Sequence, residues 1–286
     1  MMGPMPEGHT LFRLARDLDA AFGGTRPEAS SPQGRFAAGA ALLSGHTFVH
    51  ATSWGKHLFA EFEGDAWLHV HLGLIGTFTI DQVAYTGEVP VVGQVRLRLA
   101  NEAHVADLRG PNLCAVITPE QVEAVTSRLG PDPLRLDPEG LRPEPDPDLA
   151  WRKISRSGRS VAELLMDQSV LAGVGNVYRC EVLFRQRIDP FRPGKELRRS
   201  SWDAIWLDLV DLLPLGVATG KIVTVAEQVE QVRSDLAAGR VDALDTRTSY
   251  VYKRQGEPCR VCGSRIRTRE VAGRNLYWCG RCQRRR

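Results

Sequence analysis

The sequence of 286 residues lacks any apolar run that approaches the roughly 20 residues needed for a membrane-spanning helix. Its N-terminus also lacks the long apolar core of a secretory signal peptide. Both absences favour a location in the cytoplasm. Apolar residues make up 43% and charged residues 25% of the chain, as is typical of soluble globular proteins. The length allows two domains, or one domain with a small appendage.

Cysteine is scarce in most of the chain, because four of the six cysteines fall in the last 28 residues. The other two, Cys114 and Cys180, lie far apart in apolar surroundings. Disulfides are rare in intracellular proteins, and free cysteine is among the most buried residue types. We therefore expect Cys114 and Cys180 to be buried free thiols.

The net charge of +3 conceals an uneven distribution. The segment from Lys253 to Arg286 holds 11 Lys and Arg against 2 Asp and Glu, a surplus of +9. The preceding 252 residues hold 26 against 32, which leaves −6. Positive charge gathered at one end favours a polyanionic partner. A solvated basic tail is the alternative that charge alone leaves open.

The first half of the chain reads as a helix followed by β structure. Apolar residues recur at helical spacing from Leu11 to Phe22. Residues 25–115 then contain short alternating or apolar runs bounded by Gly, Asp and Pro. The clearest of these runs are 48–50, 57–62, 66–71 and 95–99. Several strands at near-regular spacing predict a sandwich or barrel, and residues 120–129 predict a closing helix.

Prolines recur from Pro131 to Pro147, which predicts a linker. A helical apolar pattern then runs from Trp151 to about Gly220, whereas residues 222–247 carry few signals. We expect an α+β multidomain protein with an N-terminal β-sandwich flanked by helices, a helical domain and a terminal ribbon. The expected boundaries are 1–129 for the sandwich, 130–150 for the linker, 151–252 for the helical domain and 253–286 for the ribbon.

The terminal cysteines form two CxxC pairs separated by sixteen residues, a spacing that matches a structural four-thiolate zinc site. The four ligands are Cys259, Cys262, Cys279 and Cys282. The spacer has the character of a hairpin with its turn at residues 272–275. Arg274 in this turn belongs to a cationic surface that does not titrate off at physiological pH. Metal would fix the hairpin, and the hairpin would hold an arginine against phosphate.

The run Met5-Pro6-Glu7 opens the N-terminal helix. If translation starts at Met5 and this methionine is removed, Pro6 carries a free secondary amine, and a free α-amino group has a reference pKa of roughly 8. Such an amine can attack an aldehyde as a Schiff-base nucleophile, with Glu7 exchanging the protons. The alternative is structural, because Pro and Glu are both favoured in the first turn of a helix.

Two further candidates need their surroundings to be interpreted. Asn176, in the run GVGNVY, stands where a helix is expected to begin, and a helix start can bind phosphate through its unpaired amides. We expect Asn176 to cap that helix and to donate its side-chain amide to a phosphate oxygen. A tight helical hairpin would explain the same glycines. Lys56, in the run WGKHL, stands at the head of an expected strand, where lysine is usually a solvated edge residue.

These motifs occur together in the order of one family: Pro6-Glu7, WGKHL, the run LMDQ…GVGNVY and the ribbon ending GRNLYWCGRCQ. From Met5 to Gln283 the chain resembles the Fpg/Nei DNA glycosylases, and within them the actinobacterial endonuclease VIII type. The resemblance implies a bifunctional DNA glycosylase/AP lyase of base excision repair. Such an enzyme excises oxidised bases and cleaves the strand by β,δ-elimination.

The resemblance also implies residue roles. Pro6 would be the Schiff-base nucleophile at sugar C1′, and Glu7 the general acid. Lys56 would act near the flanking phosphate and aid β-elimination. Asn176 would hold phosphate in a helix–two-turn–helix motif, and Arg274 would grip phosphate and assist δ-elimination.

A damaged base must leave the stack before it can be excised, and a side chain must fill the hole. The loop of residues 71–76 occupies the place from which this family supplies that wedge, so Leu74 and Ile75 are the candidates. Two core aliphatics are the alternative. Arg109, in the run DLRGP, resembles the family's probe of the opposite strand.

Three features depart from the family pattern. Residues 1–4 precede Met5, and with them retained the Pro6 nitrogen is an amide that cannot attack; we expect the true start to be Met5. Thr10 stands where many relatives carry an acidic residue. Residues 222–247 do not resemble the loop that closes on 8-oxoguanine in the Fpg branch, which favours oxidised pyrimidines over purines.

We expect one zinc ion as the only cofactor, and double-stranded DNA with oxidised bases or abasic sites as the partner. We further expect a monomer in the cytoplasm, associated with the nucleoid. Two alternatives stay open: a purine-directed formamidopyrimidine/8-oxoguanine glycosylase, and a non-catalytic damaged-DNA-binding protein if Pro6 is not the mature terminus.

Overall fold

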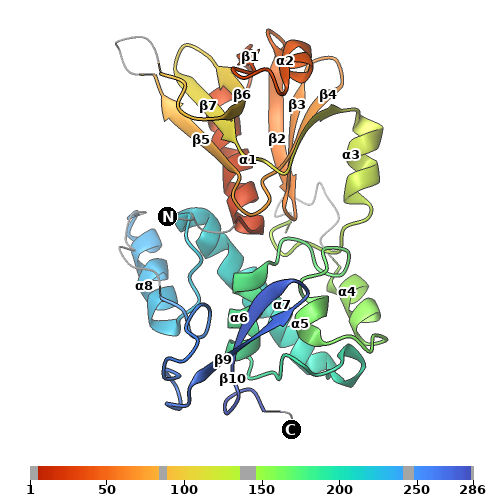
Figure 1. The fold of residues 1–286 in the computed structure, drawn as a ribbon, viewed down its shortest axis with the longest axis vertical. Coiled ribbons are helices and arrows are strands. Elements are labelled where there is room, and N and C mark those ends of the chain that lie inside the picture. The colour runs from red at the N-terminus through yellow and green to blue at the C-terminus, as the bar shows by residue number, and fades with distance from the viewer. Residues whose placement is uncertain (1–5, 84–88, 136–145, 241–247, 285–286) are drawn as a thin grey trace. The chain divides into compact units, whose positions relative to one another are not determined.

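The computed structural model describes residues 6–83, 89–135, 146–240 and 248–284 (Figure 1). The chain divides into two compact units, residues 1–128 and 129–286. Within the described ranges, no helix combines the length and the apolar character that crossing a bilayer requires.

The first unit is a sandwich of two four-stranded antiparallel sheets, with strand orders β1-β6-β7-β5 and β2-β3-β4-β8. The strands are β1 (Glu28–Ser30), β2 (Phe48–Trp54), β3 (His57–Phe62), β4 (Ala66–His71), β5 (Thr77–Gln82), β6 (Val95–Ala100), β7 (His104–Arg109) and β8 (Leu113–Ile117). The helices are α1 (Gly8–Phe22), α2 (Ala37–Leu43) and α3 (Pro119–Thr126). The sandwich expected from the sequence is confirmed.

Helices α1 and α2 close the two open sides of the sandwich (Figure 1). Helix α1 packs on β2 and β5, which are edge strands of the two sheets, and α2 packs on the opposite edge strands β1 and β8. A helix that covers an edge strand shields its apolar side chains and its unpaired backbone groups. The apolar side of α1, from Leu11 to Phe22, therefore joins both sheets in one core.

The second unit begins with helices. They are α4 (Pro147–Ile154), α5 (Val161–Leu164), α6 (Asn176–Arg185), the 3₁₀ turn η1 (Gly194–Glu196), α7 (Arg199–Thr219) and α8 (Ala226–Ala237). The turns between α5 and α6 are held by Gln168, whose Nε2 donates to the carbonyl oxygens of Met166 and Val174 at 3.1 and 2.9 Å. Its Oε1 accepts from the Gly173 amide at 3.1 Å. This side chain fixes where α6 begins.

The stretch expected to be a linker begins inside the second unit. Residues 130–134 are buried, and the Gly130 amide donates to the Gln168 carbonyl at 2.8 Å. A Cβ on Gly130 would lie 2.3 Å from the Val170 carbonyl oxygen, so only glycine fits there. At the other end, α4 already starts at Pro147 with Asp146 as its N-cap. The first residues of the expected linker are therefore buried and its last residues begin α4, whereas residues 136–145 lie outside the described residues.

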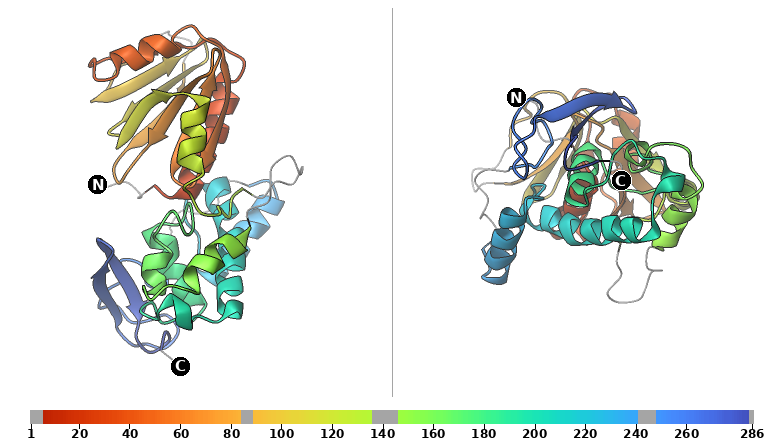
Figure 2. Two further views of the ribbon diagram at one scale, coloured as in Figure 1. Left: turned by 90° about the vertical axis from the view of Figure 1, so that its right-hand side faces the viewer. Right: turned by 90° about the horizontal axis from the view of Figure 1, so that it is seen from below.

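The chain ends in a two-stranded antiparallel ribbon of β9 (Ile266–Val271) and β10 (Arg274–Cys279) (Figure 2). Ala272 and Gly273 connect the strands with φ of 54° and 68°. Two central residues in the left-handed region form the hairpin turn whose twist matches that of the strands. Arg274 thus pairs with Val271 as the first residue after the turn.

Candidate functional site

Pro6 and Glu7 form the start of α1, and both are buried. Glu7 is the N-cap, and it shares a reciprocal capping box with Thr10, whose hydroxyl accepts from the Glu7 amide at 3.4 Å. Thr10, which departs from the acidic residue of many relatives, therefore helps to cap the start of the helix. A fully buried carboxylate stands next to Pro6 at the positive end of the helix dipole.

The path of α1 brings its first residues to the level of Lys56. The helix lies along β2 and runs in the opposite direction, since the Asp19 carboxylate accepts from the Ala51 amide and Gly24 bonds to Phe48. From Asp19 back to Glu7 the helix covers about 18 Å at 1.5 Å per residue. From Ala51 forward to Lys56 the strand covers about 17 Å. The two segments therefore end at the same height.

Lys56 lies in a two-residue hairpin turn. Trp54 and His57 form the last pair of β2 and β3, and Gly55 has a φ of 60°. Glycine at the first central position is the pattern of a type II′ turn, which leaves Lys56 at the second. The lysine is half-buried and precedes β3, where the sequence placed it.

Three histidines gather beside Lys56, on the side of the sheet that faces away from the sandwich core. The Nδ1 of His57 lies 2.9 Å from the Nε2 of His69, and the His57 and His71 ring centroids lie 5.0 Å apart. Phe59 stacks on His69 at 4.7 Å. Sequence reasoning missed this cluster. The alternation His57, Phe59 and His69, His71 was visible, but only the pairing of Phe59 with His69 joins the two runs.

These histidines are held neutral near pH 7. Burial first, and then His69, His71 and the Lys56 ammonium, lower the pKa of His57 to about 4. Burial and His71 lower the pKa of His69 to about 4. Burial and Lys56 also lower the pKa of His71. The His71 Nδ1 accepts from the Gly73 amide at 3.2 Å, so the ring proton of neutral His71 is on Nε2.

The loop after β4 carries two exposed aliphatic side chains. Leu74 is 44% and Ile75 is 71% exposed, so neither belongs to the core. The loop is narrow: the Gly76 amide donates to the Leu72 carbonyl at 3.1 Å, and a Cβ on Gly76 would lie 2.2 Å from that oxygen. The backbone therefore presents both side chains to solvent.

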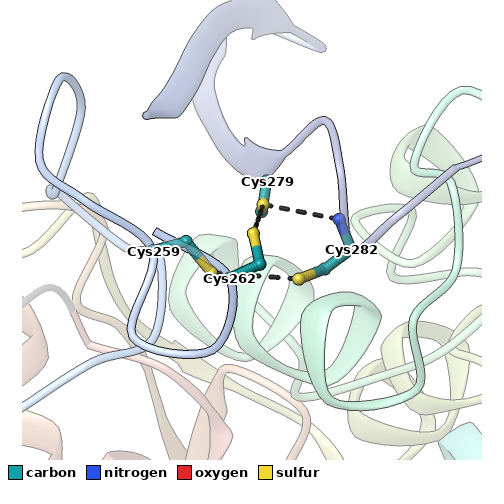
Figure 3. Close-up of side chains that lie close together, drawn as sticks. All are labelled: Cys259, Cys262, Cys279 and Cys282. Carbon is teal, nitrogen blue, oxygen red and sulfur yellow. Dashed lines mark hydrogen bonds between the residues drawn. The ribbon is translucent and has the colours of Figure 1, made fainter. Parts of the chain in front are cut away.

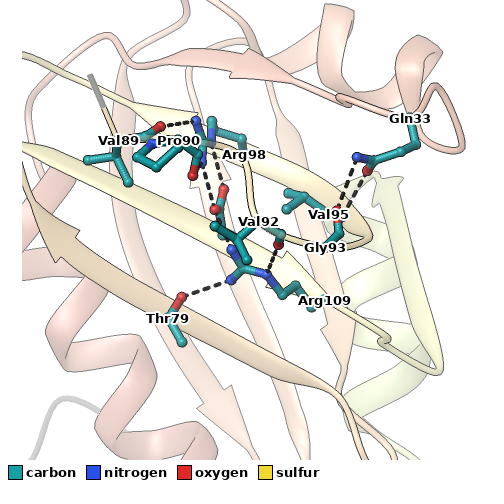
Figure 4. A network of polar contacts seen from close by, with 10 residues as sticks. Gln33, Thr79, Val89, Pro90, Val92, Gly93, Val95, Arg98 and Arg109 are labelled. Carbon is teal, nitrogen blue, oxygen red and sulfur yellow. Dashed lines mark hydrogen bonds and ion pairs between the residues drawn. The ribbon is translucent and has the colours of Figure 1, made fainter. Parts of the chain in front are cut away.

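Arg109 lies at the end of β7 in a polar network (Figure 4). Its guanidinium donates to the Asp107 carboxylate at 2.7 Å, to the Val92 carbonyl at 2.9 Å and to the Thr79 hydroxyl at 3.1 Å. The buried Asp107 also accepts from Arg98 at 2.7 and 2.8 Å. Arg109 is thus held over the sheet, a partnership that the sequence did not indicate.

In the second unit, Asn176 is the first residue of α6, and Gly175 is its N-cap. Our expectation that Asn176 caps this helix is wrong, because its buried side chain reaches the ribbon instead. Its Nδ2 donates to the Asn275 carbonyl at 3.0 Å, and its Oδ1 accepts from Arg179. Arg179 is fully buried and also donates to the Val271 carbonyl at 3.3 Å. The start of α6 is therefore joined to both sides of the Arg274 turn.

A buried carboxylate holds the segment that leads into the ribbon. Glu181 is fully buried and accepts from three successive amides, those of Tyr250, Val251 and Tyr252, at 2.8 to 2.9 Å. It also accepts from the Thr224 hydroxyl at 2.7 Å. Four donors satisfy the charge that burial would otherwise make costly.

The four terminal cysteines converge on one site (Figure 3). All four sulfurs lie within 4.8 Å of one another, so the structure brings together the expected ligands Cys259, Cys262, Cys279 and Cys282. Burial first, and then neighbouring thiols, raise the pKa of Cys282. A divalent cation offsets the repulsion that would oppose four thiolates at this spacing. The donor set fits one structural Zn²⁺. The ion would join the CxxC turn before β9 to the CxxC turn at the end of β10, and these two turns are the zinc knuckles.

Comparison with known families agrees with this arrangement. Residues 5–113 match the formamidopyrimidine-DNA glycosylase N-terminal domain, and residues 129–228 match the formamidopyrimidine-DNA glycosylase H2TH domain. Residues 256–285 match the zinc finger found in FPG and IleRS. Together these three matches span both units.

Individual relatives extend over the whole chain. Endonuclease 8 1 of Mycobacterium tuberculosis is 48% identical over 281 residues, which cover 98% of this chain and all of that protein. Endonuclease 8 of Escherichia coli is 32% identical over 290 residues, with 98% and 100% covered. Formamidopyrimidine-DNA glycosylase of Thermus thermophilus is 32% identical over 243 residues, 85% of each chain.

Solved structures share the fold. The MutM (Fpg) protein of Thermus thermophilus superposes with a TM-score of 0.72 at 27% identity, covering 97% of this chain and 98% of that one. A complex of Lactococcus lactis Fpg with abasic-site DNA superposes with a TM-score of 0.75, covering 98% and 100%. At 22% identity, this second likeness concerns the fold alone.

Proposed function

Because the chain belongs to the Fpg/endonuclease 8 family of base excision repair glycosylases, which have AP lyase activity, we propose that it excises oxidised pyrimidines through a Schiff base on Pro6. The observation that carries this proposal is the start of α1. There a buried carboxylate adjoins Pro6 at the level of the Lys56 turn. The match to the family's N-terminal domain begins at residue 5, which supports Met5 as the start.

The chemistry proceeds from the Pro6 nitrogen once Met5 is removed. Its lone pair attacks sugar C1′ as the bond from C1′ to the base breaks, and the departing base takes up the proton that the Pro6 nitrogen loses. Glu7 protonates the ring oxygen as the C1′–O4′ bond opens, which leaves an iminium between Pro6 and C1′. The iminium acidifies the C2′ proton, and its removal breaks the bond to the 3′ phosphate. Base loss and strand cleavage therefore share one covalent intermediate.

Lys56 is proposed to act beside this centre near the flanking phosphate. Its ammonium is the cation there, because the histidines around it stay neutral near pH 7. A rigid two-residue turn limits the positions that the lysine can adopt. One fixed charge next to neutral rings suits the binding of a single phosphate.

The second unit is proposed to hold the DNA strand. The Asn176 Nδ2 carries two hydrogens, and one of them is used on the Asn275 carbonyl, so the second suits a phosphate oxygen. Arg274, in the strand position after the turn, would grip the next phosphate and assist δ-elimination. Arg179 and the zinc knuckles would keep the two contacts at a constant spacing.

Leu74 and Ile75 are proposed as the wedge that fills the space of the flipped base, since apolar side chains inserted between base steps have this role elsewhere. Their exposure supports this proposal. Arg109 is proposed to probe the opposite strand, and it would exchange its bonds to Val92 and Thr79 for bonds to a base.

The preference for pyrimidines is supported by the relatives. The mycobacterial protein named endonuclease 8 is 48% identical, and the Thermus protein named formamidopyrimidine-DNA glycosylase is 32% identical. Excision of thymine glycol should therefore exceed excision of 8-oxoguanine opposite cytosine. The reverse order would favour the purine-directed alternative.

Borohydride trapping tests the central proposal. Native protein mixed with abasic-site DNA and borohydride should give a covalent adduct, and intact mass should show a chain beginning at Pro6. Protein that keeps Met1 to Met5 should give no adduct, because its Pro6 nitrogen is an amide. A fully active protein that still carries Met1 would exclude Pro6 as the nucleophile.

A further inference from the structure

The first unit contains a small basic pocket. Its volume is about 60 Å³, several times what one bound water needs, which suits a small polyatomic group rather than a base. It is lined by Gln33, Arg35, Gln94, Val95, Arg96 and Gly110. These residues come from the segment before α2, from β6 and from the end of β7.

The frame of this pocket is built by side chains that bond to backbone. The Ser31 hydroxyl donates to the Arg96 carbonyl at 2.8 Å and accepts from the Phe36 amide at 3.0 Å. Gln33 donates to the Gly93 carbonyl at 3.2 Å and accepts from the Val95 amide at 2.8 Å (Figure 4). The two segments that supply the arginines are thus held together.

Arg96 lies at a β-bulge in β6. Val95 pairs with Arg109, but Leu97 pairs with Leu108, so Arg96 is an extra residue on β6. Such a β-bulge redirects the side chain of the residue that it inserts.

The charge of the pocket is not balanced by a protein carboxylate. In the described part of the first unit, ion pairs are formed by Arg13, Arg16, Arg26, Arg98 and Arg109. Arg35 and Arg96 form none with the residues that the structure describes. Arg96 lies near the Cys114 thiol, but burial raises the pKa of that thiol to about 12, so the thiol is neutral.

The pocket borders the loop that carries the proposed wedge. Gly110 lines it, and a Cβ on Gly110 would lie 4.0 Å from both the Ile75 carbonyl oxygen and the Gly76 Cα. A group bound between the two arginines would therefore lie next to DNA held at that loop.

We propose that Arg35 and Arg96 together bind one phosphodiester of the DNA backbone beside the Leu74–Gly76 loop. This site rests on the proposed function, and it is separate from the phosphate contacts of Lys56, Asn176 and Arg274. Two arginines line one small space, and guanidinium groups match the oxygens of a phosphate. The site binds DNA and takes no part in bond breaking.

The test compares the full-length protein with Arg35→Gln, Arg96→Gln and the double variant. Arg16→Gln is the matched control, since it removes the same charge from the exposed side of α1. Binding to a duplex with an uncleavable abasic analogue is measured by fluorescence anisotropy over a series of salt concentrations. The double variant should bind about tenfold more weakly. Its log–log slope of affinity against salt should fall by about 0.9, the value for one phosphate.

Methylphosphonates placed one at a time in each strand then locate the phosphate. At one position near the lesion, a methylphosphonate should weaken binding by wild type but should not weaken binding by the double variant any further. The strand that carries this position is the strand whose phosphate the two arginines bind. A double variant that matches Arg16→Gln in affinity and slope overturns the proposal, and so does an equal response to every methylphosphonate in wild type and variant.

Borohydride trapping at saturating protein separates this site from the proposed chemistry. The double variant should trap abasic DNA as completely as wild type does. If wild type itself fails to trap, the Schiff-base mechanism fails, while the anisotropy results still decide the phosphate site. Unchanged thermal unfolding of the two single variants and the double variant would show that binding, and not folding, was altered.

Discussion

In the first unit, Glu7 and Lys56 are positioned by a sandwich with an apolar interior. In the second unit, Asn176 is positioned by the buried Arg179 and by a ribbon with a metal site. The packing of α1 on the sheets sets the height of the Lys56 turn relative to Glu7. The smaller ribbon has few apolar residues to bury, so metal and hydrogen bonds to Arg179 fix its position. The proposed chemistry of the first unit and the proposed holding of the strand by the second should therefore be separable by substitution.

The largest expected effect separates chemistry from binding. Glu7→Gln removes the acid but keeps an oxygen that can cap α1, so excision of an intact oxidised base should fall by at least about 100-fold. Cleavage of a preformed abasic site should persist in part, because the sugar aldehyde already exists. Single-turnover gel assays measure both rates. Thr10→Ala is the control, since it disturbs the capping box and keeps the carboxylate; an equal loss there would make Glu7 a capping residue.

Removal of zinc should disrupt the ribbon of the second unit. Cys279→Ser or a chelator should free β9 and β10, because zinc binding supplies the folding energy of such a ribbon. Loss of the Arg274 contact should weaken DNA binding about tenfold or more. Hydrogen exchange should become fast in the ribbon and stay slow in β2 and β3. Cys114→Ser serves as the control, and unchanged affinity of the Cys279 variant would contradict the proposed clamp.

A smaller effect is expected at the carboxylate under the ribbon. Glu181→Gln replaces a four-fold acceptor by a group whose NH₂ faces donors, so it should destabilise the second unit by about 2 kcal/mol. Urea denaturation followed by tryptophan fluorescence measures the change. Glu227→Gln, on the exposed side of α8, should change little. Equal stability of the two variants would show that the buried charge is unimportant.

The last expected effect is a pH dependence of the first unit. His57 and His69 have pKa values lowered from 6.5 to about 4, so between these values the unfolded chain binds protons that the folded chain does not. Stability should therefore fall as pH decreases from 6.5 to 4. Denaturation midpoints over this range test the sign. In the variant His57→Gln/His69→Gln the slope should be shallower, and an unchanged slope would assign the effect to other groups.

Local patterns predicted much of the fold. The expected runs 57–62 and 66–71 coincide with β3 and β4, because strand alternation and the glycine turns beside it are both local in the sequence. The zinc ligands were likewise evident from spacing alone. Helix α8 was missed, since its residues are polar and its apolar positions are few.

Contacts between distant residues were not predictable. The histidine cluster depends on the register of β3 with β4, and the pocket at Arg35 and Arg96 depends on two segments 61 positions apart. Asn176 was expected to cap α6, but its partner is Asn275, 99 residues away. A single sequence contains no signal for such pairings.

The equal lengths of α1 and β2 imply a constraint on insertions and deletions. One residue removed from the middle of α1 would withdraw Glu7 by about 1.5 Å and rotate it by about 100° around the helix axis. One residue added to the Gly55–Lys56 turn would change the turn type and move the lysine from the position that the two-residue turn gives it. We therefore expect length changes to be tolerated at the surface loops of this unit but not in either of these segments.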